Sequence, residues 1–226
     1  LKSTTILLLV ICFASFLFTV FKPKGLPVCT NADEAAFGYN AYSLLETGKD
    51  EYGTALPLRL KSFGDNKLPL YSYLSVPFVA TLGLNDLGTK GLNLLMSALL
   101  PLVVYFLTKE LLGKKSYGLI AATLTALSLS THITARQAHE SVLSLVMSIS
   151  MFIFYLRAMK AFRPRDIILF VLTTTLSLLS YHPARLLVLF LGASHLLTLF
   201  FASKVERKKI LVLGGLCKYF GLTNSR

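Results

Sequence analysis

The chain carries few charged residues for its length. Charged residues make up only 15% of its 226 residues, whereas 54% are hydrophobic. A soluble domain with this composition would have too little polar surface to cover its core. The composition therefore excludes an ordinary soluble protein and predicts a membrane protein.

Cysteine is also scarce, and no nucleotide-binding motif occurs. The three cysteines lie at positions 12, 29 and 217, inside or just after apolar segments. Their spacing fits neither a disulfide framework nor a metal site. The chain has no glycine-rich loop of the kind that cradles nucleotide phosphates, so a nucleotide-linked substrate is not expected.

Basic residues are abundant, but they form no stripe with interleaved aromatic residues. The net charge of +12 therefore does not indicate a nucleic-acid partner. The lysines and arginines gather in three clusters between apolar runs, "TKELLGKKS", "RAMKAFRPRD" and "KVERKK", as is typical of cytoplasmic loops. The intervening turns, "THITARQAHES" and "SYHPARLL", and the loop at 22–90 are then expected on the outer side.

Apolar runs recur along the chain, several of them near the ~20 residues that cross a bilayer. They cover 6–21, 91–107, 117–134, 142–156, 167–180 and 186–202, and a last run begins at 210. The first is interpreted as a retained transmembrane helix, because no small-residue cleavage site follows it. We predict an all-α fold, a polytopic transmembrane helix bundle. Because the last run stops with the chain, residues 1–226 are expected to be the N-terminal part of a longer transmembrane domain.

Two segments of the 22–90 loop are predicted to lie along the membrane surface. Residues 68–84 are apolar but contain two prolines and two tyrosines, a mixture suited to the headgroup level. After Asp33 the apolar residues roughly follow helical spacing, and Gly48 is suited to end that helix. The apolar positions of this second helix are Ala36, Tyr39, Ala41, Leu44 and Leu45.

Polar side chains gather on the predicted outer side. They comprise Asp33, Glu34, Asp50, Asp65, Lys67, Arg136, His139, Glu140, Tyr181, His182 and Arg185. Ionisable groups near membrane depth are costly, so this gathering makes a functional site the default hypothesis.

Structural alternatives stay open for several of these residues. Asp33 directly precedes a predicted helix and is suited to cap it, in which case Glu34 would only favour the helix dipole. Arg136 and Glu140 are four residues apart and would form an ordinary ion pair if one helix runs through both. Tyr181, at a helix end, is typical of a membrane-interface anchor.

Lys67 is a stronger candidate for a ligand contact than any of the four histidines. No His-x-x-x-His or comparable spacing joins His139 and His182, which are interpreted as interfacial polar residues. His132 and His195 are interpreted as structural. Lys67 precedes an interfacial segment, which would bring its ammonium to the level of lipid phosphates.

Two long stretches of the outer loop resemble a known family. "DEAAFGYNAYSLLETGKDEYG" and "SFGDNKLPLYSYLSVPFVATLGLNDLGTKGLNLL" are similar to the first outer loop of the polytopic lipid-sugar-dependent glycosyltransferases (GT-C). These include the dolichyl-phosphate-mannose protein mannosyltransferases and the bacterial lipid A aminoarabinose transferase, and this chain most resembles their prokaryotic family 39 relatives. Leu68 and Asn66 depart from the usual proline and acidic residue around the family's lysine.

The resemblance implies roles for individual residues. Asp33 would be the general base that activates the acceptor, with Glu34 beside it. Lys67, with Arg136 and Arg185, would bind the phosphate of the donor lipid. Expected to line the same cavity are Asp65, His139, Glu140, Tyr181 and His182. No metal ligands are assigned and no cofactor is expected, although the family's occasional divalent metal leaves that question open.

Three functions are compatible with these patterns. The first is transfer of a sugar from a polyprenyl-phosphate donor to a lipid, glycan or protein acceptor, on the outer face of the cell membrane. The second is a transporter or flippase, whose charges would bind a lipid-linked or anionic substrate during alternating access. The third is a purely structural membrane protein, which would not need these charged residues. Convergence of the carboxylates and Lys67 at one place would favour the first.

Overall fold

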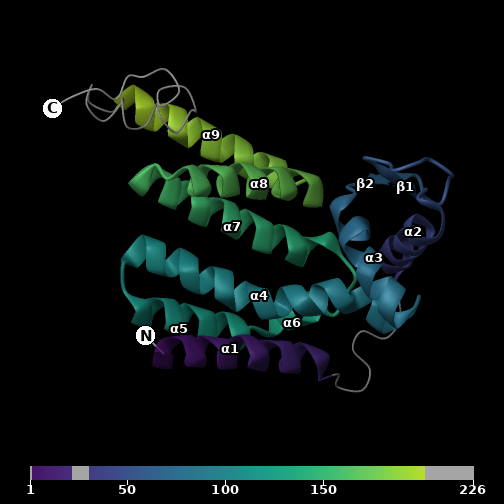
Figure 1. Ribbon diagram of the computed structural model, residues 1–226, viewed down its shortest axis with the longest axis horizontal. Coiled ribbons are helices and arrows are strands. Elements are labelled where there is room, and N and C mark those ends of the chain that lie inside the picture. Colours follow the sequence, from purple (N-terminus) through teal and green to yellow (C-terminus); the bar gives the residue numbers. More distant parts are fainter. Residues whose placement is uncertain (1, 22–30, 202–226) are drawn as a thin grey trace.

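The computed structural model describes residues 2–21 and 31–201, which form helices and one short hairpin (Figure 1). The elements in chain order are α1 (Lys2–Val20), α2 (Ala32–Thr47), β1 (Leu60–Ser62), β2 (Asp65–Lys67), α3 (Leu70–Leu82), α4 (Asp86–Leu112), α5 (Lys115–Ala126), α6 (Leu129–Ala135), α7 (Glu140–Ala161), α8 (Pro164–Ser180) and α9 (Ala184–Phe201). The longer helices run lengthwise beside one another. The all-α polytopic helix bundle is therefore confirmed.

Three helices of the described part are long and apolar enough to cross a membrane, namely α1, α4 and α7. A fourth span results if α5 and α6 are counted as one broken span. The predicted runs at 167–180 and 186–202 correspond to α8 and α9. Helix α8 has 17 residues, and the apolar part of α9 spans Ala184–Leu197, so both are shorter than the three candidate spans. The last run, from 210, lies outside the described residues.

The apolar run at 117–134 forms two helices, α5 and α6. The chain bends by 59° between α5 and α6, where Ser128 is extended. The His132 ring donates a hydrogen bond from Nε2 to the carbonyl of Ala126, at 2.7 Å, and its Nδ1 lies 2.7 Å from Oγ1 of Thr19. Because the ring satisfies a carbonyl that the break leaves free, His132 has the structural role that the sequence suggested.

The connections alternate between two ends of the bundle, as the charges of the loops predicted. The basic connections around 113–115 and 162–163 lie at one end, with the N-terminus (Figure 1). At the other end lie α2, α3, the hairpin and the turns at 136–139 and 181–183; we call this the site end, and the first the basic end. The third basic cluster, at 204–209, lies outside the described residues.

Helix α2 begins and ends at capping residues. Its N-cap is Asn31, whose side chain accepts from the backbone N–H of Glu34 while the Glu34 carboxylate accepts from the Asn31 N–H. This capping box places Asp33 inside the first turn, so Asp33 is not the cap. Gly48 ends the helix with a φ of +66°, a conformation that glycine adopts at no steric cost.

The buried face of α2 differs from the predicted one. Ala36, Ala41 and Leu44 are buried as expected, together with Phe37. Tyr39 and Leu45 were expected on that face, but both are exposed. Phe37 contacts the ring of Tyr71 on α3, with centroids 4.9 Å apart.

Helix α3 runs across the ends of the long helices (Figure 1). Its 13 residues rise about 20 Å, which is less than the ~30 Å of a hydrocarbon core. It is therefore no straight span, as expected. Tyr71 was expected at the headgroup level but is fully buried in the protein, and its hydroxyl donates to the carbonyl of Thr89 at 3.3 Å.

The β1–β2 hairpin joins α2 to α3 and sets the position of Lys67. The two strands are antiparallel, with Leu60 opposite Lys67. The turn between them has φ values of +48° at Phe63 and +80° at Gly64, as in a tight hairpin turn in which glycine is favoured. The hairpin was not predicted, although "SFGD" is compatible with such a turn.

The main hydrophobic core lies beneath the site end. Its buried members come from α2, α3, α4, the end of α6, the segment before α7 and α7 itself. A second cluster joins α1, α4 and α5 further along the bundle. There, a Cβ on Gly118 would lie 2.7 Å from the Tyr105 ring, so α4 and α5 approach as closely as small residues allow in membrane helix pairs.

Candidate functional site

Asp33 and Lys67 form an ion pair at the site end. Lys67 Nζ donates to Asp33 Oδ1 at 2.6 Å. The Lys67 side chain is 8% exposed, whereas that of Asp33 is 48% exposed. The ammonium also lies 5.1 Å from the centroid of the Phe37 ring, a cation–π contact. The Lys67 ammonium is thus covered by the Phe37 ring, and the Asp33 carboxylate is the solvent-accessible member of the pair.

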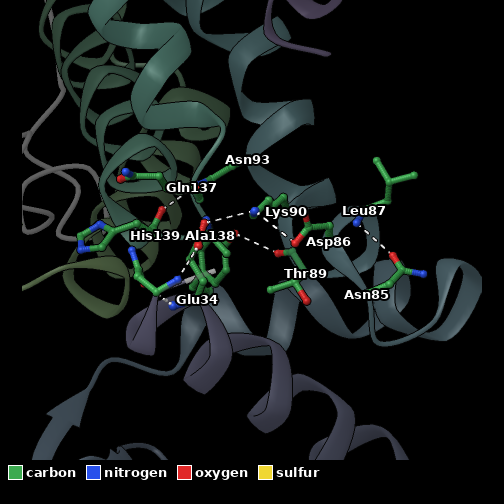
Figure 2. Close-up of polar contacts among 12 residues, drawn as sticks. Glu34, Asn85, Asp86, Leu87, Thr89, Lys90, Asn93, Gln137, Ala138 and His139 are labelled. Atoms are coloured by element: carbon green, nitrogen blue, oxygen red, sulfur yellow. Dashed lines mark hydrogen bonds and ion pairs between the residues drawn. The ribbon is translucent and has the colours of Figure 1, made fainter. Parts of the chain in front are cut away.

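Glu34 is buried in a different set of contacts (Figure 2). One carboxylate oxygen, Oε1, accepts from the backbone N–H of Ala138 at 2.9 Å and lies 3.6 Å from Nζ of Lys90. The other, Oε2, accepts from the N–H of Asn31 at 2.9 Å. The interpretation that Glu34 merely favours the helix dipole was therefore wrong: the carboxylate joins α2 to α4 and to the segment before α7.

Lys90 is a charged residue of the site end that the sequence analysis missed. Its side chain is 10% exposed and lies between Glu34 and Asp86, with Nζ 3.2 Å from Asp86 Oδ1. Figure 2 shows the lysine reaching from α4 toward both carboxylates. Asp86 and Lys90 are four residues apart at the start of a helix, a spacing that predicts an ion pair.

The segment between α6 and α7 is held by Asn93 of α4. The Asn93 side-chain amide donates to the carbonyls of Gln137 and His139, at 2.6 and 2.7 Å (Figure 2). The chain is not helical here, because α6 ends at Ala135 and α7 begins at Glu140. The structural alternative of a helical Arg136–Glu140 pair is therefore wrong.

Arg136 points to the end of α1. It is 8% exposed, and its guanidinium donates to the carbonyls of Thr19, Phe18 and Phe21 at 2.7 to 2.9 Å. These carbonyls are at the C-terminal end of the helix, where a cation is favourable. The structure thus places the guanidinium, which the sequence assigned to the donor phosphate, in a helix cap.

His139, Tyr181 and His182 connect three further segments at the site end. The His139 ring packs edge-on against Tyr181, with centroids 5.6 Å apart, and its Nδ1 lies 3.8 Å from Glu140 Oε2. On the other side, His182 Nε2 lies 3.2 Å from the carbonyl of Asn66, the residue before Lys67. The structure therefore brings β2, the 137–139 segment and the turn before α9 together.

Two carboxylates come near the same buried tyrosine. Burial raises the pKa of the Tyr71 hydroxyl far above its usual range, and the negative charges of Glu34 and Glu140 raise it further. Glu140 Oε2 is buried without a hydrogen-bond partner among the described residues, as is Oδ1 of Asn93. Glu34 and Glu140, which lie on either side of Tyr71 in the sequence, therefore both come near it at the site end.

Three other predicted residues contribute less to this arrangement. Arg185 is exposed in the first turn of α9. The side chain of Asp65 lies outside the described part of the structure. Asp50 is buried and accepts from the backbone N–H groups of Tyr52 and Thr54, which makes it a turn-forming residue.

A pocket of about 320 Å³ adjoins Glu34. It lies between α2 and the beginning of α4, and its lining includes Tyr39, Asn85 and Thr89. Gly38 faces Thr89 so closely that a Cβ on it would lie 2.6 Å from the threonine hydroxyl. Within residues 2–21 and 31–201, no three His, Cys, Asp or Glu side chains are grouped to hold a metal ion.

A family model matches more than half of the chain. The family model of the dolichyl-phosphate-mannose-protein mannosyltransferases matches residues 66–220, and no curated protein matches the chain. The matched region begins just before Lys67 and includes the turns with Glu140 and Tyr181. Asp33 and Glu34 precede the matched region, and each forms an ion pair with a lysine inside it, Lys67 and Lys90 respectively. The chain is thus a polytopic membrane protein of the GT-C glycosyltransferase type, and it belongs to the dolichyl-phosphate-mannose-protein mannosyltransferase family.

Proposed function

We propose that the protein transfers a sugar from a polyprenyl-phosphate donor to an acceptor hydroxyl or amine at the site end. The observation that carries this proposal is the pair of Asp33 and Lys67, 2.6 Å apart, with the aspartate half exposed. The Asp33 carboxylate can accept the proton of the acceptor, and the adjacent Lys67 ammonium can stabilise the leaving phosphate. Sugar transfer from a lipid phosphate requires both groups.

The reaction would invert the configuration at the anomeric carbon. The acceptor heteroatom gives its proton to the Asp33 carboxylate and forms a bond to the anomeric carbon. The bond from that carbon to the phosphate oxygen breaks, and its electron pair leaves with the polyprenyl phosphate. Lys67 stabilises the charge that develops on this phosphate.

Asp33 rather than Glu34 is the base in this proposal. The Glu34 side chain is 1% exposed and already accepts hydrogen bonds from two backbone N–H groups. Such a carboxylate has little room to approach an acceptor. We assign Glu34 and Lys90 to positioning, because they connect the first turn of α2 to α4 and so hold the neighbouring Asp33 near Lys67.

The arrangement favours a transferase over a transporter or flippase. Glu34, Lys67, Lys90 and Glu140 lie in elements that meet at the site end. Along the middle of α1, α4 and α7 the buried polar groups are mainly uncharged serine side chains. A transporter that alternates access would instead hold its substrate near the midplane.

A donor assay tests the proposal. The intact protein, in detergent or liposomes, is given radiolabelled sugars linked either to polyprenyl phosphate or to a nucleotide, with lipid, glycan and peptide acceptors. We expect transfer from the lipid-linked donor alone. Transfer from a nucleotide sugar, or from neither donor, would contradict the proposal.

Lys67 gives a sharper version of this test. Lys67→Ala is expected to weaken donor binding by about ten- to a hundredfold, because a charge-assisted contact is worth ~1.5 to 3 kcal/mol. The matched control is Lys61→Ala, which removes an exposed lysine from the partner strand of the same hairpin. Equal losses in both variants would indicate a general charge effect instead of a phosphate contact.

The outward orientation of the site is part of the proposal and has its own test. After replacement of the native cysteines, Tyr52→Cys at the site end and Lys115→Cys at the basic end are treated with a membrane-impermeant thiol reagent in intact cells. Both positions are exposed. We expect labelling of Tyr52→Cys alone; labelling of Lys115→Cys alone would reverse the orientation.

A further inference from the structure

A second group of charged side chains surrounds a cavity at the basic end. The cavity measures about 540 Å³ and lies beside the connection between α7 and α8. Its charged lining consists of Glu110, Arg157, Lys160, Arg163, Arg165 and Asp166. Four cations face two carboxylates, so the cavity is electropositive. Nothing in the proposed sugar transfer uses it.

Two of these cations are committed to Glu110. Arg157 Nε donates to Glu110 Oε1 at 2.8 Å, and Lys160 Nζ lies 3.3 Å from Oε2. The Arg157 guanidinium also lies over the ring of Phe154, 5.8 Å from its centroid. These contacts fix one wall of the cavity and neutralise its inner carboxylate.

The other two cations are available to a ligand. Arg163 and Arg165 are exposed, and in the part of the chain that the structure describes neither guanidinium has an ion pair or hydrogen bond. They flank Pro164, the first residue of α8, so the positive end of the helix dipole adds to their charge. Phe154 and Leu169 give the same cavity apolar surface.

We infer that this cavity binds the phosphate of an anionic phospholipid in the leaflet at the basic end. A guanidinium binds phosphate oxygens in a bidentate manner, and basic pockets between membrane helices are suited to lipid headgroups. The apolar walls match the glycerol and the start of the acyl chains. The site is separate from the Asp33–Lys67 pair, which lies at the opposite end of the bundle.

Lipid binding to the intact protein tests this inference. Native mass spectrometry in detergent compares retention of phosphatidylglycerol and phosphatidylcholine by the unsubstituted protein and by Arg163→Gln/Arg165→Gln. We expect preferential binding of phosphatidylglycerol, reduced about tenfold or more in the double variant, because the guanidinium groups lose their charge-assisted contacts with the lipid phosphate. Arg163→Lys/Arg165→Lys keeps the charge without the guanidinium fork and should fall between the two.

The matched control removes two lysines from the same end but outside the cavity. Lys114→Gln/Lys115→Gln should leave the preference for phosphatidylglycerol intact, since neither residue lines the cavity. An equal loss in this control would show that surface charge alone attracts the lipid and would overturn the inference. So would the absence of any preference over phosphatidylcholine, or displacement of phosphatidylglycerol by inorganic phosphate, which would indicate a site for the free ion.

Discussion

The two ends of the bundle use charge in opposite ways. At the site end, Glu34, Lys67 and Lys90 are buried or nearly so, and each has a partner at a defined distance. At the basic end, Lys160 is 55% exposed even where it pairs with Glu110, and Arg163 is exposed. Exposed charges in loops orient the chain in the membrane. Buried pairs instead fix the positions of individual atoms.

This difference explains why the two ends should respond differently to substitution. A buried charge that loses its partner remains in a medium of low polarity and is costly. An exposed pair is screened by solvent and salt, so its loss costs little. The comparison can be tested by removing charged side chains from each end and measuring thermal unfolding of the purified protein in detergent.

The largest effect on stability is expected at Glu34. Glu34→Ala leaves the buried Lys90 ammonium with Asp86 alone and removes the acceptor of the Ala138 and Asn31 N–H groups. We expect a loss of about 3–5 kcal/mol, because two hydrogen bonds to a charged group and part of a buried ion pair are lost together. Glu34→Gln, which keeps the capping box, should cost less, and Glu46→Ala on the exposed face of the same helix serves as the control. Equal melting temperatures for Glu34→Ala and Glu46→Ala would contradict the account.

A smaller loss is expected at Arg136. Arg136→Ala removes hydrogen bonds to three carbonyls at the end of α1, and we expect a cost of about 2–3 kcal/mol. Arg136→Lys should recover only part of it, because one ammonium cannot reproduce the geometry of the guanidinium fork. Normal stability with weakened donor binding would instead return Arg136 to the phosphate-binding role that its sequence position suggested.

The smallest effect is expected at the basic end. Lys160→Ala breaks an exposed pair with Glu110 while the shorter contact from Arg157 remains, so the loss should stay within about 1 kcal/mol. Raising the salt concentration should reduce this difference further. A loss as large as that of Glu34→Ala would break the comparison between the two ends.

The architecture could be predicted from the sequence because it depends on local properties. Apolar runs fix where helices form, and the basic clusters fix which connections share an end. Gly48 ended α2 as expected, since a helix stop depends on one residue's backbone freedom. The break after Ala126 could not be predicted in this way, because it depends on a histidine six residues later that accommodates the free carbonyl.

The site could be predicted in part. That Asp33 and Lys67 belong to one site followed from the family resemblance, but their ion pair and the hairpin that places Lys67 did not. Lys90 was missed because it directly precedes an apolar run. Its spacing from Asp86 was a usable signal, but its contact with Glu34 joins residues far apart in the sequence. Arg136 was assigned to the site because its turn was expected on the outer side and resembles the family, whereas its partners lie at the end of α1, more than a hundred residues earlier.

The central claim, that Asp33 is the general base, is tested most directly by Asp33→Asn in the intact protein. Because Asn31 caps α2, this substitution leaves the cap unchanged and removes only the proton acceptor and the ion pair with Lys67. We predict that sugar transfer from a polyprenyl-phosphate donor falls by about 10²- to 10⁴-fold, while donor binding is retained or tightened because Lys67 is released from its partner. Transfer at the unsubstituted rate would contradict the account and leave Asp33 as a structural partner of Lys67.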